Sequence, residues 1–438
     1  MQESIQRAPV LHRVDSKLTI SDGFWIPELD GLRAFACALV VIAHFNPWIA
    51  SDPFVYQSII LQPIKSIQGG NTGVMLFFCL SSFLLTSVCL ADIDRHGHIN
   101  LAAFFLRRIL RIWPLYFFIL GISMLLIWPG LPIPQAPGAS TAPLAWKWAK
   151  QAAPFYGVFV GNWIAHQVSE IGILWTICVE EQFYFALPFV LMWVVRFRWQ
   201  YLIILLAVAA TASSIIFFSR LGLSPPISSP YYQTTTYIST FAFGGVAALM
   251  LHRRQTANEL ANPLLLFACI VFLIIILSRN PDFWWGPYRL RAVALYQIVP
   301  AMLAFIVWWV ARHSGAWFLL FLRSKLLRSI GILSYGIYLT HVISHRFVNL
   351  EGYLLGLHPS GLTYYLLFIQ YAAFAVFLAA LTHGFVERPF LSIRKQLLPN
   401  KASAIDARWH VNWGQVAAIA GGLSTLCLIA LYLVSVAA

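Results

Sequence analysis

The sequence predicts an all-α membrane protein, a polytopic transmembrane helical bundle of about eleven spans. Of its 438 residues, 60% are hydrophobic and only 10% are charged, whereas soluble domains average about 25% charged residues. A soluble protein of this composition would expose large apolar patches and aggregate. We therefore expect the lipid bilayer to be a principal partner of the chain.

Eleven apolar segments have the length that a helix needs to cross the hydrocarbon core. Residues 152–166 are apolar but short, and are either a twelfth span or a re-entrant segment. The predicted spans are residues 30–49, 72–90, 109–128, 174–194, 200–219, 235–251, 263–278, 293–311, 329–347, 363–385 and 413–436.

The distribution of Lys and Arg predicts that the N-terminus lies inside. In that orientation 19 of the 29 basic residues fall in inside segments and seven in outside loops, as expected because Lys and Arg are retained on the cytoplasmic side. Residues 129–173 then form one long outer loop. The basic residues are scattered through short loops, so we expect no nucleic-acid partner.

Residues 1–27 are polar and mixed in charge, and predict a cytoplasmic N-terminal tail. We expect the membrane core at 28–390, a basic cytoplasmic linker at 391–412 and a last transmembrane helix at 413–438. The six cysteines all lie in apolar segments without paired spacing, as is typical of small buried residues. No HExxH or related spacing is present, so we expect no metal.

The first predicted span, ELDGLRAFACALVVIAHF, contains two costly polar residues, Arg33 and His44. Eleven residues make about three helical turns, which places both on nearly the same face and roughly 16 Å apart along the axis. Ionisable groups within spans are functional candidates. The plainer alternatives are a snorkelling anchor for Arg33 and an interhelical hydrogen bond for His44.

The third predicted span begins with FLRRILRIWPLYF. Arg108 and Arg111 are i, i+3 neighbours on one helix face, and two guanidinium groups at a membrane edge can fork onto phosphate oxygens. The alternative is simple anchoring at the cytoplasmic surface.

The fourth predicted span, LWTICVEEQFYFALP, contains the adjacent carboxylates of Glu180 and Glu181. Both are expected about 10 Å below the outer surface, close to the depth of His44. A carboxylate there either orients the imidazole and raises its basicity or balances an arginine such as Arg111 or Arg346. Further along, Tyr338, His341 and His345 share a helical stripe that either lines a polar cavity or forms a packing face.

The order of these motifs resembles the acyltransferase-3 family of membrane O-acyltransferases, over residues 28–390. The motifs that carry the resemblance are ELDGLRAFACALVVIAHF, GVMLFFCLSSFLLT, FLRRILRIWPLYF, LWTICVEEQFYFALP, SYGIYLTH and VERPF. One departure is that the family's Ser-Gly-Phe is Ser81, Ser82 and Phe83 here, and a glycine would permit closer backbone approach.

The resemblance implies a ten-span core with both ends inside, so that residues 413–436 add one span and leave the C-terminus outside. It implies a bacterial cytoplasmic membrane, an acyl-CoA donor with acetyl-CoA favoured, and a carbohydrate or glycolipid acceptor. It assigns Arg33 and His44 to the family's first-span pair, Arg108 and Arg111 to its R-x-x-R pair, and Glu180 and Glu181 to its acidic segment.

On this basis we expect three kinds of site residue. His44 is the candidate general base or acyl carrier, with Glu180 and Glu181 as its catalytic partners. Arg33, Arg108 and Arg111 are the candidate ligands of the CoA phosphates. The candidate oxyanion or cavity residues are Ser81, Ser82, Tyr116 and His341. A membrane transporter is the main alternative, although it does not explain the cluster of arginines on the CoA-accessible side.

Overall fold

The structure is a computed structural model, and it is a bundle of helices. It describes residues 26–45, 69–129, 142–164, 169–197, 204, 207–213, 215–216, 230–253, 262–277, 289–357, 361–398 and 413–437. These residues contain helices and no strand, which confirms the all-α prediction. Residues 1–25 of the N-terminal tail and residues 399–412 of the predicted linker lie outside the described residues.

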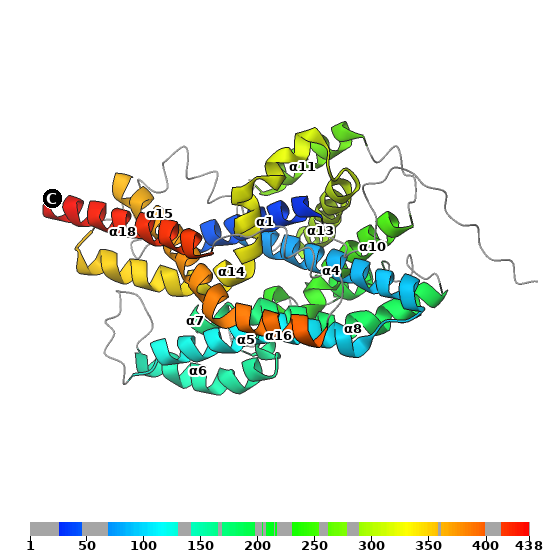
Figure 1. Cartoon of the computed structure of the whole chain (residues 1–438), viewed down its shortest axis with the longest axis horizontal. Coiled ribbons are helices and arrows are strands. Elements are labelled where there is room, and N and C mark those ends of the chain that lie inside the picture. Colours follow the sequence, from blue (N-terminus) through cyan, green and yellow to red (C-terminus); the bar gives the residue numbers. More distant parts are fainter. Residues whose placement is uncertain are drawn as a thin grey trace, which may run out of the picture.

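The helices follow one another along the chain as shown in Figure 1. The long ones are α1 (Pro27–His44), α4 (Gly69–His96), α5 (Leu101–Leu126), α6 (Ala142–Gly157), α8 (Trp175–Phe197), α10 (Ile238–His252), α11 (Pro263–Leu277), α13 (Arg289–Arg312), α14 (Lys325–Leu354), α15 (Gly361–Thr382), α16 (Arg388–Leu397) and α18 (Trp413–Ala437). The short ones are α7 (Ser169–Gly172), the 3-10 helices η1 (Gly161–Trp163), η2 (Pro230–Tyr232), η3 (Thr234–Tyr237) and η5 (Trp317–Arg323), and a π-helical turn, η6 (His383–Glu387).

Eight of the described helices are long and apolar enough to span a membrane. They include α4, α5, α8, α13, α14 and α18, and two further spans that run through η3–α10 and through α15–α16. Because α1 carries three charged side chains in its first two turns, it is not among the eight. The apolar helix α11 is shorter than a span, and the predicted span 200–219 is described only in part. The count of eleven spans stays a prediction.

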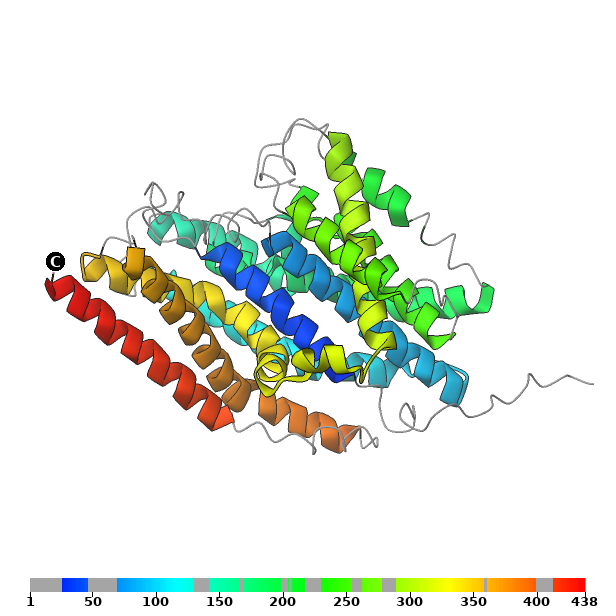
Figure 2. The ribbon, with the colours of Figure 1, turned by 90° about the horizontal axis from the view of Figure 1, so that it is seen from above.

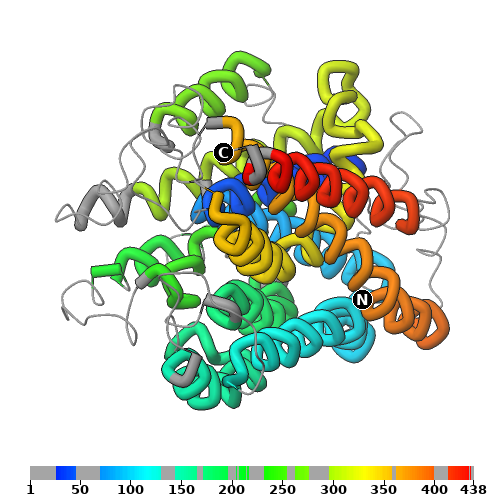
Figure 3. Tube along the Cα trace, turned by 90° about the vertical axis from the view of Figure 1, so that its left-hand side faces the viewer, coloured from blue at the N-terminus to red at the C-terminus, as the bar shows by residue number. Residues whose placement is uncertain are grey.

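Helix α1 lies at the centre of the bundle, between α4 and α14, as the side and end views show (Figures 2 and 3). One side of α1, including Ala36 and Val40, packs into the main hydrophobic cluster with α4. The other side, including Cys37 and Val41, packs into a second cluster with α14 and α15. Helix α18 lies along α15 at the edge of the bundle (Figure 2).

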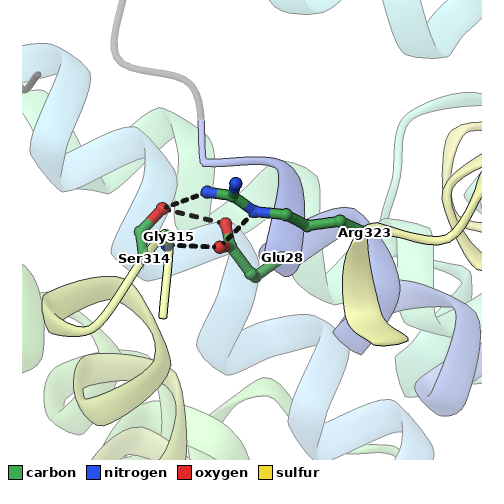
Figure 4. A network of polar contacts seen from close by, with 4 residues as sticks. All are labelled: Glu28, Ser314, Gly315 and Arg323. Carbon is green, nitrogen blue, oxygen red and sulfur yellow. Dashed lines mark hydrogen bonds and ion pairs between the residues drawn. The ribbon is translucent and has the colours of Figure 1, made fainter. Parts of the chain in front are cut away.

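The start of α1 is fixed by a buried carboxylate (Figure 4). Glu28 is completely buried and pairs with Arg323 at the end of η5, where Nε of the arginine lies 2.6 Å from the carboxylate. The backbone N–H of Gly315 and the hydroxyl of Ser314 also donate to Glu28, at 2.8 and 2.9 Å. We call these four residues the α1 clip. It attaches the first turn of α1 to the segment between α13 and α14.

The outer loop predicted at 129–173 contains a helix of its own. Helix α6 occupies 16 residues, is not among the helices that could span a membrane, and packs against α5. Its alanines Ala145, Ala149 and Ala152 are buried, whereas Trp148 and Phe155 are exposed. The three alanines recur at helical spacing, so α6 packs a face of small side chains inward and leaves the larger Trp148 and Phe155 outside.

Candidate active site

Helix α1 places Arg33 and His44 beside two adjoining cavities. Arg33 lines a small inner cavity of about 50 Å³, and His44 lines an outer cavity of about 300 Å³. Both cavities touch one side of the same helix, as the spacing of eleven residues predicts. Two residues line both cavities, Val74 of α4 and Tyr338 of α14.

The inner cavity is lined mainly by α1, α4, α8 and α14. Its polar side chains are Arg33, Ser81, Thr176, Glu180, Ser334, Tyr335 and Tyr338. The hydroxyl of Ser81 donates to one oxygen of Glu180 at 3.0 Å, and the hydroxyl of Tyr184 donates to the other at 2.8 Å. Glu180 therefore has a fixed orientation at the wall of the cavity.

Three arginines lie near one another beside the inner cavity: Arg33 of α1, and Arg108 and Arg111 of α5. Arg111 lies close enough to Arg33 and Arg108 to repel both electrostatically, and Glu180 attracts Arg33 and Arg108. Within the described part of the chain, none of the three guanidiniums forms an ion pair, and Nε of Arg33 and of Arg108 is buried without a hydrogen-bond partner. Unsatisfied buried N–H donors beside like charges form a site that an anion would stabilise.

Glu181 points to a different partner from Glu180, as adjacent residues on a helix must. Its Oε2 accepts from the indole N–H of Trp113 at 3.1 Å, and its Oε1 has no partner among the described residues. Neither glutamate is among the hydrogen-bond partners of His44. The structure thus brings Glu180 to the arginines rather than to the histidine.

The outer cavity is aromatic and contains two histidines. Its lining includes His44, Trp175, Tyr231, Tyr232, Tyr338 and His345. The Nδ1 of His44 lies 2.9 Å from the carbonyl oxygen of Val40. A carbonyl can only accept, so Nδ1 carries the proton and Nε2 keeps a lone pair. The side chain of His44 is exposed to this cavity.

His341 lies directly behind His44. The two ring centroids are 5.0 Å apart in an edge-on arrangement, and Nδ1 of His341 lies 2.6 Å from the carbonyl oxygen of Tyr338. His341 is completely buried, and its Nε2 has no partner among the described residues. His341 therefore supports the ring of His44 rather than lining the cavity.

A polar network positions the tyrosines of the outer cavity. The amide of Gln182 donates to Asn162 at 2.9 Å, and the amide of Asn162 donates to the carbonyl of Tyr232 at 3.1 Å and to the hydroxyl of Thr234 at 3.1 Å. Thr234 in turn donates to Gln182. Burial raises the pKa of Tyr231 well above its usual range, so its hydroxyl stays protonated. Nothing in the sequence pattern around SPYYQTTTY indicates that these tyrosines meet α8.

Among the candidate residues, Arg33, His44, Ser81 and Glu180 line a cavity, whereas Arg108, Arg111, Glu181, His341, Tyr116 and Ser82 do not. Tyr116 is completely buried, and its hydroxyl donates to the carbonyl of Tyr156 at 2.8 Å. Ser82 is also completely buried, and donates to the carbonyl of Phe241. Ser81 alone of the serine pair lines a cavity.

Helix α10 faces Ser82, and its Gly244 provides the close backbone approach that a glycine at position 82 would permit. A Cβ added to Gly244 of α10 would lie 2.6 Å from the carbonyl oxygen of Cys79 and 3.0 Å from Cβ of Ser82. Helices α4 and α10 therefore pack tightly in spite of the Ser82 side chain, because the small residue is on α10. The departure from the Ser-Gly-Phe pattern is compensated in the packing.

No group of three or more His, Cys, Asp or Glu side chains that could hold a metal is present in the described residues.

Comparison with known proteins identifies related sequences. The acyltransferase-3 family, described as an acyltransferase domain, matches residues 26–384. The chain is similar to the O-acetyltransferase OatA of Staphylococcus aureus strain MRSA252, with 27% identity over 405 residues that cover 86% of this chain and 60% of the relative. It is equally similar to OatA of strain NCTC 8325 / PS 47, with 27% identity over 392 residues covering 85% and 58%.

The chain thus spans only about 60% of the length of these curated relatives. No solved structure matches the chain. The family match covers both cavities and every residue that lines them. The chain, a membrane protein, belongs to the acyltransferase-3 family.

Proposed function

We propose that the protein is a membrane O-acetyltransferase that moves an acetyl group from acetyl-CoA to a hydroxyl of a glycan. The observation that carries the proposal is the pair of adjoining cavities. Arg33 lines one of them, with Arg108 and Arg111 within electrostatic reach, and His44 lines the other with its Nδ1 bound to the carbonyl of Val40. The relatives are O-acetyltransferases by name, which supports the choice of acetyl.

The arginines are the proposed donor site. CoA carries several phosphates, and Arg33, Arg108 and Arg111 offer planar guanidinium groups that match phosphate oxygens. We place this end of the bundle at the cytoplasmic face, where the donor is available and where the predicted topology has most of the basic residues. The N-terminus is then inside, and α18 crosses once more to leave the C-terminus outside.

His44 is the proposed base. With Nδ1–H bound to the carbonyl of Val40, its Nε2 can take the proton of an acceptor hydroxyl. The hydroxyl oxygen then attacks the thioester carbon, the C–S bond breaks, and the CoA thiolate leaves and takes up the proton held by His44. In the covalent alternative, Nε2 attacks the thioester carbon and the C–S bond breaks to release the CoA thiolate. The acceptor hydroxyl then attacks the acyl-imidazole, the C–N bond to Nε2 breaks, and the hydroxyl proton passes to the thiolate. Either route uses the same atom of His44.

The outer cavity is the proposed acceptor site. Its aromatic wall contains Trp175, Tyr231 and Tyr232, with ring centroids 5.1 Å apart for Trp175 and Tyr231 and 5.3 Å for Trp175 and Tyr232. Aromatic rings beside a few hydroxyls suit a ligand that presents both apolar ring faces and polar edges. A carbohydrate or glycolipid headgroup has this chemistry.

Replacing His44 with Ala tests the proposal. We expect the H44A protein to lose detectable acetyl transfer, a drop of at least about 100-fold for a general base, while it is expressed and elutes as a single species in detergent. The measurement is mass spectrometry of surface glycans from cells with each variant, together with thiol release from acetyl-CoA by purified protein. Wild-type levels of glycan acetylation in H44A cells would refute the role of His44. A transporter would release no thiol in either variant.

A further inference from the structure

The narrow junction between the two cavities is formed by two side chains that the sequence motifs do not single out as a pair. Val74 of α4 and Tyr338 of α14 each line both the inner and the outer cavity. Both are almost completely buried, with 3% and 5% of their surface exposed. Any group that extends from the arginines toward His44 must pass between or beside them.

Tyr338 is held in place from two sides. The hydroxyl of Thr176 on α8 donates to the Tyr338 hydroxyl at 2.8 Å, and the Tyr338 hydroxyl donates to the carbonyl of Ile173 at 3.3 Å. Its ring lies edge-on to Phe77 of α4, with centroids 6.1 Å apart, and 5.7 Å from the ring of His341. A tyrosine with both its hydroxyl and its ring engaged has a single orientation, so the junction is preorganised.

We propose that Tyr338 and Val74 form a partition that keeps water away from the donor thioester while letting the donor arm reach His44. The inference rests on the proposed function, since it assumes a thioester donor that enters from the arginine end. In this arrangement the donor arm fills the junction, and the ring of Tyr338 closes it around the arm. Tyr338 is a specificity-determining residue, because it favours transfer to an acceptor over transfer to water.

The competing reaction is hydrolysis. Water attacks the thioester carbon, the C–S bond breaks, and acetate and the CoA thiol are released. A site that activates an acceptor hydroxyl with His44 would also activate water, and closing the site against water is how enzymes suppress such side reactions. The inner cavity is small, about 50 Å³, whereas the outer cavity of about 300 Å³ is large enough to hold many waters. Val74 and Tyr338 therefore lie between a smaller cavity beside Arg33 and a larger cavity beside His44.

The test measures thiol release from acetyl-CoA by the purified protein in detergent without any acceptor. Tyr338→Ala removes the ring and joins the cavities, so we expect acceptor-free hydrolysis to rise at least about tenfold over wild type. Tyr338→Phe is the matched control: it keeps the ring and loses the two hydrogen bonds, and we expect its hydrolysis to stay within about threefold of wild type. Adding His44→Ala to Tyr338→Ala should return hydrolysis to the wild-type level or below.

Val74→Ala provides a second route should Tyr338→Ala fail to fold, as judged by gel filtration and thermal melting. Val74→Ala removes two methyl groups and so widens the junction. We expect an increase in hydrolysis smaller than that of Tyr338→Ala but larger than that of Tyr338→Phe. A folded Tyr338→Ala or Val74→Ala protein with wild-type hydrolysis would overturn the partition. So would a Tyr338→Phe protein that hydrolyses as fast as Tyr338→Ala, because the hydroxyl rather than the ring would then be responsible.

Calorimetric titration with acetyl-CoA separates failure of the partition from failure of the proposed function. Wild-type protein that binds acetyl-CoA, together with variants whose hydrolysis is unchanged, counts against the partition alone. Wild-type protein that binds no acetyl-CoA counts against the proposed function and against the partition with it.

Discussion

The α1 clip leads to a prediction that the structure allows to be worked in detail. Glu28 is completely buried and accepts hydrogen bonds from Arg323, Gly315 and Ser314. Breaking a buried ion pair by removing one partner costs about 3–5 kcal/mol. In Glu28→Ala the group left behind is Arg323, whose side chain is 34% exposed and can partly rehydrate, so we expect the lower end, about 3 kcal/mol. Glu28→Gln keeps an acceptor oxygen without the charge, and we expect about half that cost.

Arg323→Ala is the informative counterpart. It leaves the Glu28 carboxylate at zero exposure with only Gly315 and Ser314 as partners, so we expect a loss of about 3–5 kcal/mol, at least as large as that of Glu28→Ala. The double variant should lose less than the sum of the single losses, with a coupling energy of about 1–3 kcal/mol.

The assay is thermal melting of the purified variants in one detergent at one protein concentration. The expected order of melting temperature is wild type, then Glu28→Gln, then Glu28→Ala, with Arg323→Ala at or below the last. Because Arg33 follows Glu28 by five residues on α1, we also expect KM for acetyl-CoA to rise in Glu28→Ala. The reasoning is refuted if Glu28→Ala has the same melting temperature as the wild type. It is also refuted if the stability lost in the double variant equals the sum of the losses in Glu28→Ala and Arg323→Ala.

Two further predictions concern the donor site and the α4–α10 contact. Replacing Arg111 with Ala should raise KM for acetyl-CoA about 10-fold to 100-fold, the worth of one or two charge-assisted bonds to phosphate; steady-state kinetics measure it, and an unchanged KM would remove Arg111 from the donor site. Gly244→Ala should lower stability by about 1–3 kcal/mol, because its Cβ would meet the backbone of Cys79. Gly245→Ala is its control: the nearest atoms to its Cβ, on Thr86 and Ser82, are 3.4 and 3.5 Å away, and equal melting temperatures for the two variants would contradict the packing argument.

The helix boundaries show where an apolar pattern stops being informative. The predicted span 72–90 is part of α4, which runs on to His96, and the predicted span 329–347 is part of α14, which continues to Leu354. Helix α4 is followed by Gly97, whose φ of 76° suits a glycine after a helix. Helix α5 then begins with a cap in which the side-chain oxygen of Asn100 accepts a hydrogen bond from the backbone N–H of Ala103. Capping signals, rather than the loss of apolar residues, set the boundary between α4 and α5.

The two glutamates show what a sequence leaves open. The adjacent carboxylates in an apolar span indicated a functional segment, but left open whether each serves a histidine or an arginine. In the structure Glu180 bonds to Ser81 and Tyr184 beside the arginines, and Glu181 bonds to Trp113. A rotation of one residue, about 100°, exchanges these environments. Only packing against the neighbouring helices sets that rotation.

The class of fold, the family and the shared face of Arg33 and His44 can all be predicted from the order of the amino acids. These properties depend on composition, motif order and the geometry of a single helix, all of which are local along the chain. Tertiary structure alone decided that Ser81 faces a cavity while Ser82 is buried, that Tyr231 and Tyr232 meet Trp175, and that Val74 and Tyr338 close the junction between the cavities. The physical reason is that a cavity is bounded by side chains from helices distant in sequence, whose relative depth and rotation arise only when the whole bundle packs.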